Sequence, residues 1–433
     1  MLRAAGLVEC FHINRHLLGL DSCVVLSAKY SCADGTFPTK EQLFPALRKV
    51  IETHAALGVK LEEEDSKKPS FVRLETIQLP LVVRFSDNDN LEAAIQAQLA
   101  RSFNTLAPLP LWRVEVLSDG TILLAFHHSI GDGLSGVAFH QSLLAALQQE
   151  LIVGDDSLLI SVPQSLTLSP PIETLTNLRP SLRKVLTEIF YMFAPASWTP
   201  AYSAWTANPV PQIPELKPHV KLLTFSSAEM TAFAAACRSH SATVTSALYI
   251  LTTSTLSRLV PPDVPQYKTL SAHVAISLRG AGSLPAAAMG DYASGHHSYP
   301  PLHAAFNWAA AADYARELQR QKLAAREEAG MLMLLFGDIA GFMRGRLGRK
   351  RGGTFEISNA GRVAVAGAGR WRIGRMAFAQ CDVVIGAALK LNVIGDPTGA
   401  VSVTLTWGEG SIDRPLVESF AAQFEEGLRT LIV

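Results

Sequence analysis

Residues 121–147, TILLAFHHSIGDGLSGVAFHQSLLAAL, constrain the fold of this chain more than any other stretch. Six apolar or β-branched residues come first, and they predict a buried strand. Helical periodicity starts after Asp132 and Gly133. An acidic residue is favoured at the start of a helix, and glycine lets another segment approach the backbone closely. The stretch therefore predicts a strand and a helix joined by a rigid turn that carries two histidines.

Helix-like and strand-like segments alternate along the whole chain of 433 residues. Nine short runs with strand character lie between six segments with helical periodicity. This mixture predicts a layered α/β fold, and a hydrophobic fraction of 48% is sufficient for a large core. The helical segments are residues 39–57, 90–103, 133–151, 243–260, 304–329 and 415–431.

Proline marks the place where the chain divides. Ten of the 24 prolines lie between residues 163 and 218. Proline fixes φ and removes a backbone donor, so regular core structure is not expected there. We therefore predict an N-terminal half over residues 1–165, a proline-rich crossover over 166–218 and a C-terminal half over 219–433.

Charge and cysteine content exclude several classes of protein. Lysine and arginine total 38, as do aspartate and glutamate, so no net charge would attract nucleic acid. No apolar run approaches the roughly 18 residues that span a bilayer, and the first twenty residues are too polar for a signal peptide. Five cysteines without paired spacing indicate reduced thiols. These features together predict a cytoplasmic protein without a transmembrane segment.

The two histidines of the turn cannot do the same work. Side chains alternate along a strand, so His127 and His128 point to opposite faces and only one can face a given cleft. The same divergence argues against a metal site built from His127, His128 and Asp132, and we predict no metal. An imidazole held at the end of a strand suits general-base catalysis near neutral pH.

Residues 127–133 match the pattern HHxxxDG, the signature of the chloramphenicol-acetyltransferase-like superfamily. The rest of the chain resembles the fungal-type alcohol acetyltransferase family within it. The segments that carry this resemblance occur in the family's order from near the N-terminus onward. They are FHINRHLLGLDSCVVLSAKY (11–30), AISLRG (275–280), MGDYASG (289–295) and FEISNAG (355–361).

The resemblance implies two chloramphenicol-acetyltransferase-like halves, a pseudo-dimer, with the reaction chamber in a tunnel between them. It implies that His128 is the general base and that Asp132 pairs with Arg279 instead of facing the substrate. It also implies that the SNxG segment lines the chamber from the other half. The further residues expected to bind substrate or the oxyanion are His127, Gly133, Ser358 and Asn359.

The implied activity is direct transfer of an acyl group from a CoA thioester to a hydroxyl. The donor is expected to be acetyl-CoA or another acyl-CoA, which acts as co-substrate, with no permanently bound cofactor. The acceptor is expected to be a small alcohol that is lipophilic or belongs to specialised metabolism, and the protein is expected to be a monomer. Two alternatives stay open: a silent member that only binds a ligand in the tunnel, and a condensation-type enzyme that uses a carrier-protein thioester.

Two further features need an interpretation. The basic run RGRLGRKRGG (344–353) could meet CoA phosphates or make a weak contact with an anionic membrane, but its glycine content favours a solvated loop. His12 and His16 are spaced to share one face of a helix. Because no HExxH pattern accompanies them, we predict that they are packing or surface residues.

Overall fold

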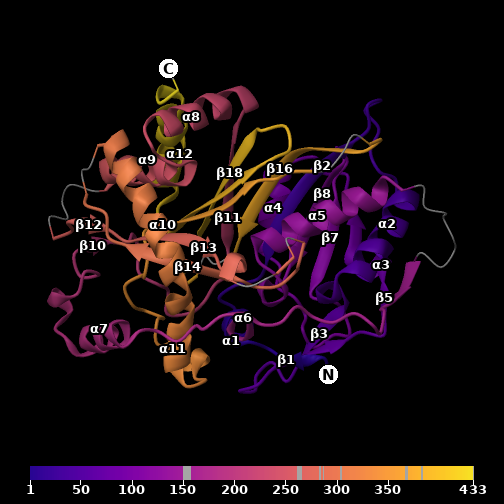
Figure 1. Cartoon of the computed structure of the whole chain (residues 1–433), viewed down its shortest axis with the longest axis horizontal. Helices are drawn as coiled ribbons and strands as arrows, with labels where there is room; N and C mark the ends of the chain where they lie inside the picture. The colour runs from indigo at the N-terminus through magenta and orange to yellow at the C-terminus, as the bar shows by residue number, and fades with distance from the viewer. Residues whose placement is uncertain are drawn as a thin grey trace.

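The computed structural model describes residues 1–149, 158–260, 266–281, 284–285, 287–302, 305–365, 369–381 and 384–432. It has two lobes that lie side by side, each built around one large sheet (Figure 1). Helices and strands are mixed in both lobes, as the sequence predicts.

The five-stranded sheet of the first lobe has the order β16-β2-β8-β7-β6, and β8 (Thr121–Phe126) lies at its centre. All six residues of β8 are buried, because helices cover both faces of the sheet. Leu124 and its even-numbered neighbours pack with α2 (Lys40–Thr53) and α5 (Gly133–Leu147). Leu123 and Ala125 pack on the other side with α4 (Leu91–Leu99). The remaining strands are β2 (Val24–Ser31), β6 (Val83–Phe85), β7 (Trp112–Val116) and β16 (Arg372–Gln380).

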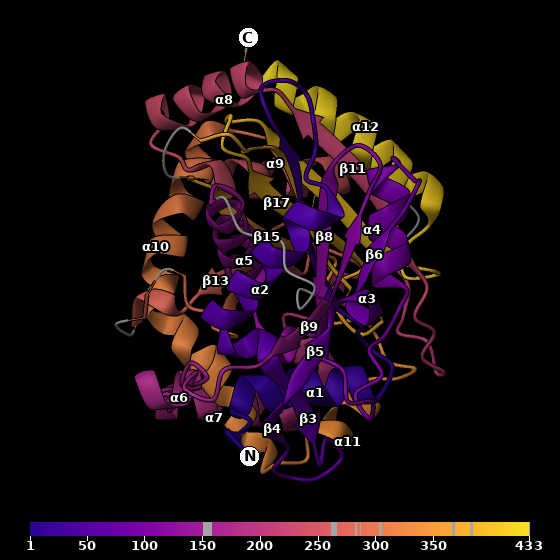
Figure 2. The ribbon, with the colours of Figure 1, turned by 90° about the vertical axis from the view of Figure 1, so that its right-hand side faces the viewer.

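The six-stranded sheet of the second lobe has the order β11-β18-β17-β15-β13-β14. The strand β15 pairs in parallel with both β13 and β17, and the other pairs are antiparallel. Helices α10 (Trp308–Gly330, orange) and α12 (Arg414–Thr430, yellow) lie on the outside of this lobe in Figure 2. The other elements of the lobe are β11 (Pro218–Phe225), β13 (Ala272–Ser277), β14 (Ala293–Ser298), β15 (Phe355–Arg362), β17 (Leu389–Gly395), β18 (Val401–Gly408), α8 (Ser227–Ser239) and α9 (Val244–Leu259).

The strand β16 connects the two lobes. It lies late in the chain, yet it pairs antiparallel with β2, with Gln380 opposite Val24. The side-chain amide of Gln380 donates to Oδ1 of Asn392 on β17 (3.2 Å), and the backbone carbonyl of Gln380 accepts from the hydroxyl of Thr406 on β18 (3.1 Å). The two sheets therefore meet at the end of β16.

Smaller elements complete the chain. The proline-rich segment holds little core structure, and no residue of its longest helix, α7 (Leu182–Phe193), is buried. Among the described residues, no helix is both long and apolar enough to cross a bilayer. The small elements are β1 (Arg3–Ala4), β3 (Val59–Glu62), β4 (Ser70–Arg73), β5 (Thr76–Gln78), β9 (Leu159–Ser161), β10 (Ala204–Trp205), β12 (Thr269–Leu270), α1 (Leu7–Leu17), α3 (Leu79–Val82), α6 (Ile172–Leu175) and α11 (Ile339–Arg344).

Candidate active site

The turn between β8 and α5 is rigid because its polar groups are used locally. A short 3₁₀ turn, η2 (His128–Ile130), follows the strand, and Asp132 caps α5. Oδ1 of Asp132 accepts hydrogen bonds from the backbone N–H (2.9 Å) and the hydroxyl (3.0 Å) of Ser135. A Cβ atom at Gly133 would come within 3.0 Å of the Phe378 ring on β16, so only glycine fits there without displacing the ring.

The ion pair expected between Asp132 and Arg279 is present and joins the two lobes. Nη2 of Arg279 lies 2.7 Å from Oδ1 of Asp132, and Nε lies 3.2 Å from Oδ2. The guanidinium also donates to the carbonyl of Ala288 (2.6 Å) and to the hydroxyl of Ser135 (3.0 Å). Both carboxylate oxygens of Asp132 are thereby occupied, which suits a part in holding the turn.

His127 does not line the chamber, contrary to its expected contact with substrate. Its Nδ1 accepts hydrogen bonds from the backbone N–H (3.1 Å) and the hydroxyl (2.8 Å) of Ser129. Its ring lies against the ring of His16 on α1, with 4.5 Å between centroids. The alternation that turns His128 toward the cavity turns His127 into the packed interior of the first lobe.

His128 lies on the wall of a cavity between the lobes. This cavity has a volume of about 310 Å³, and its walls come from α1, the turn, β16 and the second sheet. Gly133, Ser358 and Lys390 are also on its walls. Burial lowers the pKa of His128 below the ordinary 6.5, so the ring is a neutral proton acceptor at pH 7.

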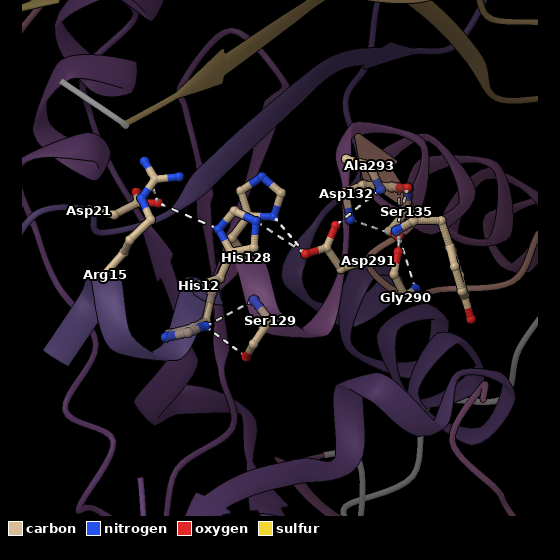
Figure 3. A network of polar contacts seen from close by, with 12 residues as sticks. His12, Arg15, Asp21, His128, Ser129, Asp132, Ser135, Gly290, Asp291 and Ala293 are labelled. Atoms are coloured by element: carbon tan, nitrogen blue, oxygen red, sulfur yellow. Dashed lines mark hydrogen bonds and ion pairs between the residues drawn. The ribbon is translucent and has the colours of Figure 1, made fainter. Parts of the chain in front are cut away.

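Two residues that sequence reasoning did not select, His12 and Asp291, lie directly against His128 (Figure 3). The rings of His12 and His128 are stacked, with 3.7 Å between centroids and 9° between planes. Oδ2 of Asp291 lies 3.2 Å from Nε2 of His12 and 3.7 Å from Nδ1 of His128. His12 therefore lies within the candidate site, and of the two places predicted for it, packed or on the surface, the structure shows it packed against His128.

Charged groups surround these three residues. Oδ2 of Asp21 lies 4.0 Å from Nδ1 of His12 and 3.5 Å from Nη2 of Arg15. Burial alone would raise the pKa of Asp21, but Arg15 and His12 bring it well below its ordinary value. Burial raises the pKa of Asp291 well above its ordinary value, and the Asp132 carboxylate acts in the same direction.

His12, His128 and Asp291 do not have the geometry of a metal site. Their ligand atoms lie within 4.8 Å of one another, which is close enough for one ion to contact all three by distance alone. However, a histidine nitrogen donates its lone pair in the plane of the ring, and the planes of two stacked rings are parallel. The two lone pairs therefore do not converge on one ion at the roughly 2 Å that zinc requires.

The SNxG segment contributes one of its two expected residues. Ser358 lines the 310 Å³ cavity, whereas Asn359 lines a separate pocket beside α8. Nδ2 of Asn359 donates to the hydroxyl of Thr245 (3.0 Å), and its Oδ1 accepts from the backbone N–H of Gly361 (2.8 Å). Successive residues of β15 point to opposite faces of the sheet, so the prediction that Asn359 faces the chamber is wrong.

A second cavity, of about 890 Å³, adjoins the first. Five residues line both cavities: Phe11, Arg15, His273, Glu328 and Glu356. Half of the basic run is exposed, as a solvated loop would be. Even so, the run contributes four cations to this larger cavity. They are Arg346, Arg349, Lys350 and Arg351.

The contacts of these cations show how the run is held. Nη1 of Arg351 donates to the carbonyl of Val384 (2.6 Å). Nζ of Lys350 donates to the carbonyl of Ala201 (2.7 Å). The end of the run is therefore held against the rest of the chain, and four of its cations lie along one wall of a cavity.

Comparison with known proteins identifies the architecture. A family model described as alcohol acetyltransferase matches residues 4–428. The probable alcohol acetyltransferase FCK4 of Fusarium pseudograminearum is 25% identical, with 98% of this chain and 94% of that protein covered. TRI3 trichothecene 15-O-acetyltransferase from Fusarium sporotrichioides superposes with a TM-score of 0.70 at 11% identity, covering 99% of this chain and 94% of that one. The condensation domain of the Monacolin K polyketide synthase MokA gives 0.66 at 11% identity, covering 99% and 97%. The two structural matches confirm the predicted fold class.

Proposed function

Since the chain belongs to the alcohol acetyltransferase family and is therefore an acyltransferase, we propose that it transfers an acetyl group from acetyl-CoA to an alcohol, with His128 as the general base. The observation that carries the proposal is the position of His128. It lies on a cavity between two lobes, beside a turn that Asp132 and Arg279 hold in place. Of the further residues expected to bind substrate, Gly133 and Ser358 line the cavity with His128. His127 and Asn359 do not line it.

The reaction needs one proton carrier and no covalent bond between the acyl group and the enzyme. The neutral imidazole of His128 takes the proton of the acceptor hydroxyl while the alcohol oxygen attacks the thioester carbonyl. As the tetrahedral intermediate collapses, the carbon–sulfur bond breaks and the CoA thiolate takes the proton from the imidazolium. The ester and free CoA leave, and His128 is neutral again. Ser358 lies on the same cavity, and we assign its hydroxyl as a donor to the developing oxyanion.

The larger cavity, which we call the basic cavity because four cations of the basic run line it, is a suitable place for the acyl donor. Acetyl-CoA carries several phosphate charges, and four cations from residues 346–351 line a cavity that shares wall residues with the one that holds His128. Guanidinium groups bind phosphate oxygens in a bidentate manner, which makes them suitable partners. We therefore place the CoA phosphates in the larger cavity and the thioester near His128.

The acceptor is an alcohol that carries further polar groups. The walls of the smaller cavity include the buried ion pair of Lys390 and Glu356 (3.0 Å) and the hydroxyls of Ser294 and Ser358. A plain hydrocarbon alcohol would remove water from the ion pair without offering it a polar group, and this desolvation costs free energy even for paired charges. Of the two acceptor classes expected from the sequence, this lining favours an oxygenated specialised metabolite over a simple lipophilic alcohol.

The cysteines support direct transfer. All five are free, and burial raises the pKa of Cys23 and Cys381 above the ordinary value for a thiol. The pKa of Cys10 is raised to about 12 and that of Cys237 to about 11. A thiol acts as a nucleophile only as the thiolate, so none of these four is activated for an acyl-enzyme route.

The test is incubation of the protein with acetyl-CoA and a panel of alcohols that ranges from hexanol to oxygenated polycyclic alcohols. Product is read by mass spectrometry and CoA by thiol release. We expect acetylation of an oxygenated member and none by His128→Ala. Acetylation only from an acetylated carrier protein would overturn the CoA donor in favour of a condensation-type enzyme. Binding of alcohols without any product from either donor would overturn the enzyme assignment in favour of a silent binding protein.

A further inference from the structure

We propose that Asp291 and His12 are positioning residues that hold His128 in the tautomer and orientation needed for proton abstraction. The inference rests on the proposed role of His128 as base. It concerns how the protein directs one nitrogen of that ring to the substrate.

The first observation concerns the proton of the neutral ring. A base that accepts a proton at Nε2 must carry its own hydrogen at Nδ1, and that hydrogen needs an acceptor. Nδ1 of His128 is buried and makes no hydrogen bond to any other described residue, although the backbone of His128 itself also interacts with the ring. Oδ2 of Asp291, at 3.7 Å, is the carboxylate oxygen that faces it. This distance is longer than a hydrogen bond, as catalytic contacts often are before substrate binds.

The second observation concerns Asp291 itself. Its side chain is fully buried, and Oδ2 is also without a hydrogen bond among the described residues. Oδ1 accepts from the backbone N–H of Ala293 (3.3 Å), which fixes the orientation of the carboxyl group. A buried carboxyl oxygen with no hydrogen-bonding partner costs free energy. Oδ2 lies between the imidazoles of His12 and His128, where it can accept a hydrogen bond from either ring.

The third observation is the ring of His12. Its stacking at 3.7 Å leaves the His128 ring no room to rotate about χ2 on that side. Its Nε2 lies 3.2 Å from the same Oδ2 of Asp291, and its Nδ1 faces Asp21 at 4.0 Å. His12 thus fixes the plane of His128 and also completes a row of groups from Asp21 through His12 to Asp291.

The charges of this interior are consistent with the arrangement. Burial raises the pKa of Asp291, whereas burial and the neighbouring His128 lower the pKa of His12. Both directions favour a neutral carboxyl group beside a neutral imidazole, and Oδ2 keeps a lone pair that faces Nδ1 of His128. The charged groups that face the three residues are Glu9, Arg15, Asp21, Asp132 and Arg279.

The test compares two variants of Asp291 that differ in one property. Asp291→Asn keeps an acceptor oxygen, whereas Asp291→Leu has a similar size and no acceptor. Asp291→Leu leaves the backbone N–H of Ala293 without its acceptor, so circular dichroism first checks that this variant is folded. His12→Phe keeps the stacked ring and His12→Ala removes it. His16→Phe is the matched control, since His16 lies on the same helix but contacts His127.

We expect Asp291→Leu to lower kcat about 100-fold, with Asp291→Asn and His12→Ala nearer 10-fold. The KM for acetyl-CoA should change by less than about twofold in all variants, since the donor contacts are intact. The ¹⁵N spectrum of His128 should show hydrogen at Nδ1 in the wild-type protein and in Asp291→Asn, and its loss in Asp291→Leu. His16→Phe should change neither kcat nor the tautomer.

Two results would overturn the proposal: a kcat for Asp291→Leu within about threefold of wild type, or an unchanged tautomer in that variant. The spectrum needs no substrate, so it judges the positioning role even if no alcohol reacts. An active His128→Ala protein would instead contradict the role of the base.

Discussion

Breaking the ion pair between Asp132 and Arg279 should cost more than the loss of one hydrogen bond. The side chains are only 7% and 11% exposed, so removal of one partner strands the other in the interior. Arg279→Met leaves a buried carboxylate without its cation, and we expect a loss of about 3–5 kcal/mol in the free energy of unfolding. Asp132→Asn leaves the guanidinium its bonds to the carbonyls of Ala288 and Gly290, so we expect about 1–3 kcal/mol.

The double variant should lose less than the two single variants together. Once the carboxylate is gone, Arg279→Met no longer strands a charge, and the coupling energy should be about 1–3 kcal/mol. The assay is urea unfolding at pH 7, followed by fluorescence and circular dichroism, with a slope that must stay constant across the four proteins. Losses that add within about 0.5 kcal/mol would refute the view that the pair acts as a unit.

Four further predictions address the reaction. His128→Ala should lower kcat about 10³–10⁴-fold and leave the affinity for acetyl-CoA unchanged by calorimetry. As the pH is lowered, kcat/KM should stay constant through pH 7 and fall only below pH 6.5, because the lowered pKa keeps His128 neutral until the solution is more acidic. A fall that begins above pH 7 as the pH is lowered would contradict this prediction. Rates measured against both substrates should give intersecting double-reciprocal lines, and acetyl-CoA alone should leave the intact mass unchanged. Arg346→Ala should raise the KM for acetyl-CoA about 5–10-fold with little change in kcat, and an unchanged KM would remove the donor from the basic cavity.

The sequence predicted those parts of the site that depend on neighbouring residues. Asp132 and Gly133 follow a strand and open a helix, so their places come from local pattern alone. Alternation could also have separated Ser358 from Asn359, since adjacent residues of a strand cannot both face one cavity.

The rest depends on packing between distant segments. His12 comes to His128 only because α1 packs against η2, and Asp291 comes from the loop before β14 in the other lobe. A histidine among the apolar residues of a helix gives no sign of this, because such residues are usually part of the core. Asp291 does lie within MGDYASG, so its position in a segment that follows Arg279 was the available signal.

The late position of β16 in the sequence determines when the first sheet can be completed during synthesis. During synthesis the first lobe emerges with β2 as an open edge, since the partner that covers it lies at residues 372–380. An uncovered edge strand invites pairing with other chains, and contacts between such distant residues form slowly. The N-terminal half therefore has to wait for most of the polypeptide before its sheet is complete. We expect nascent chains that stop before residue 372 to depend on chaperones.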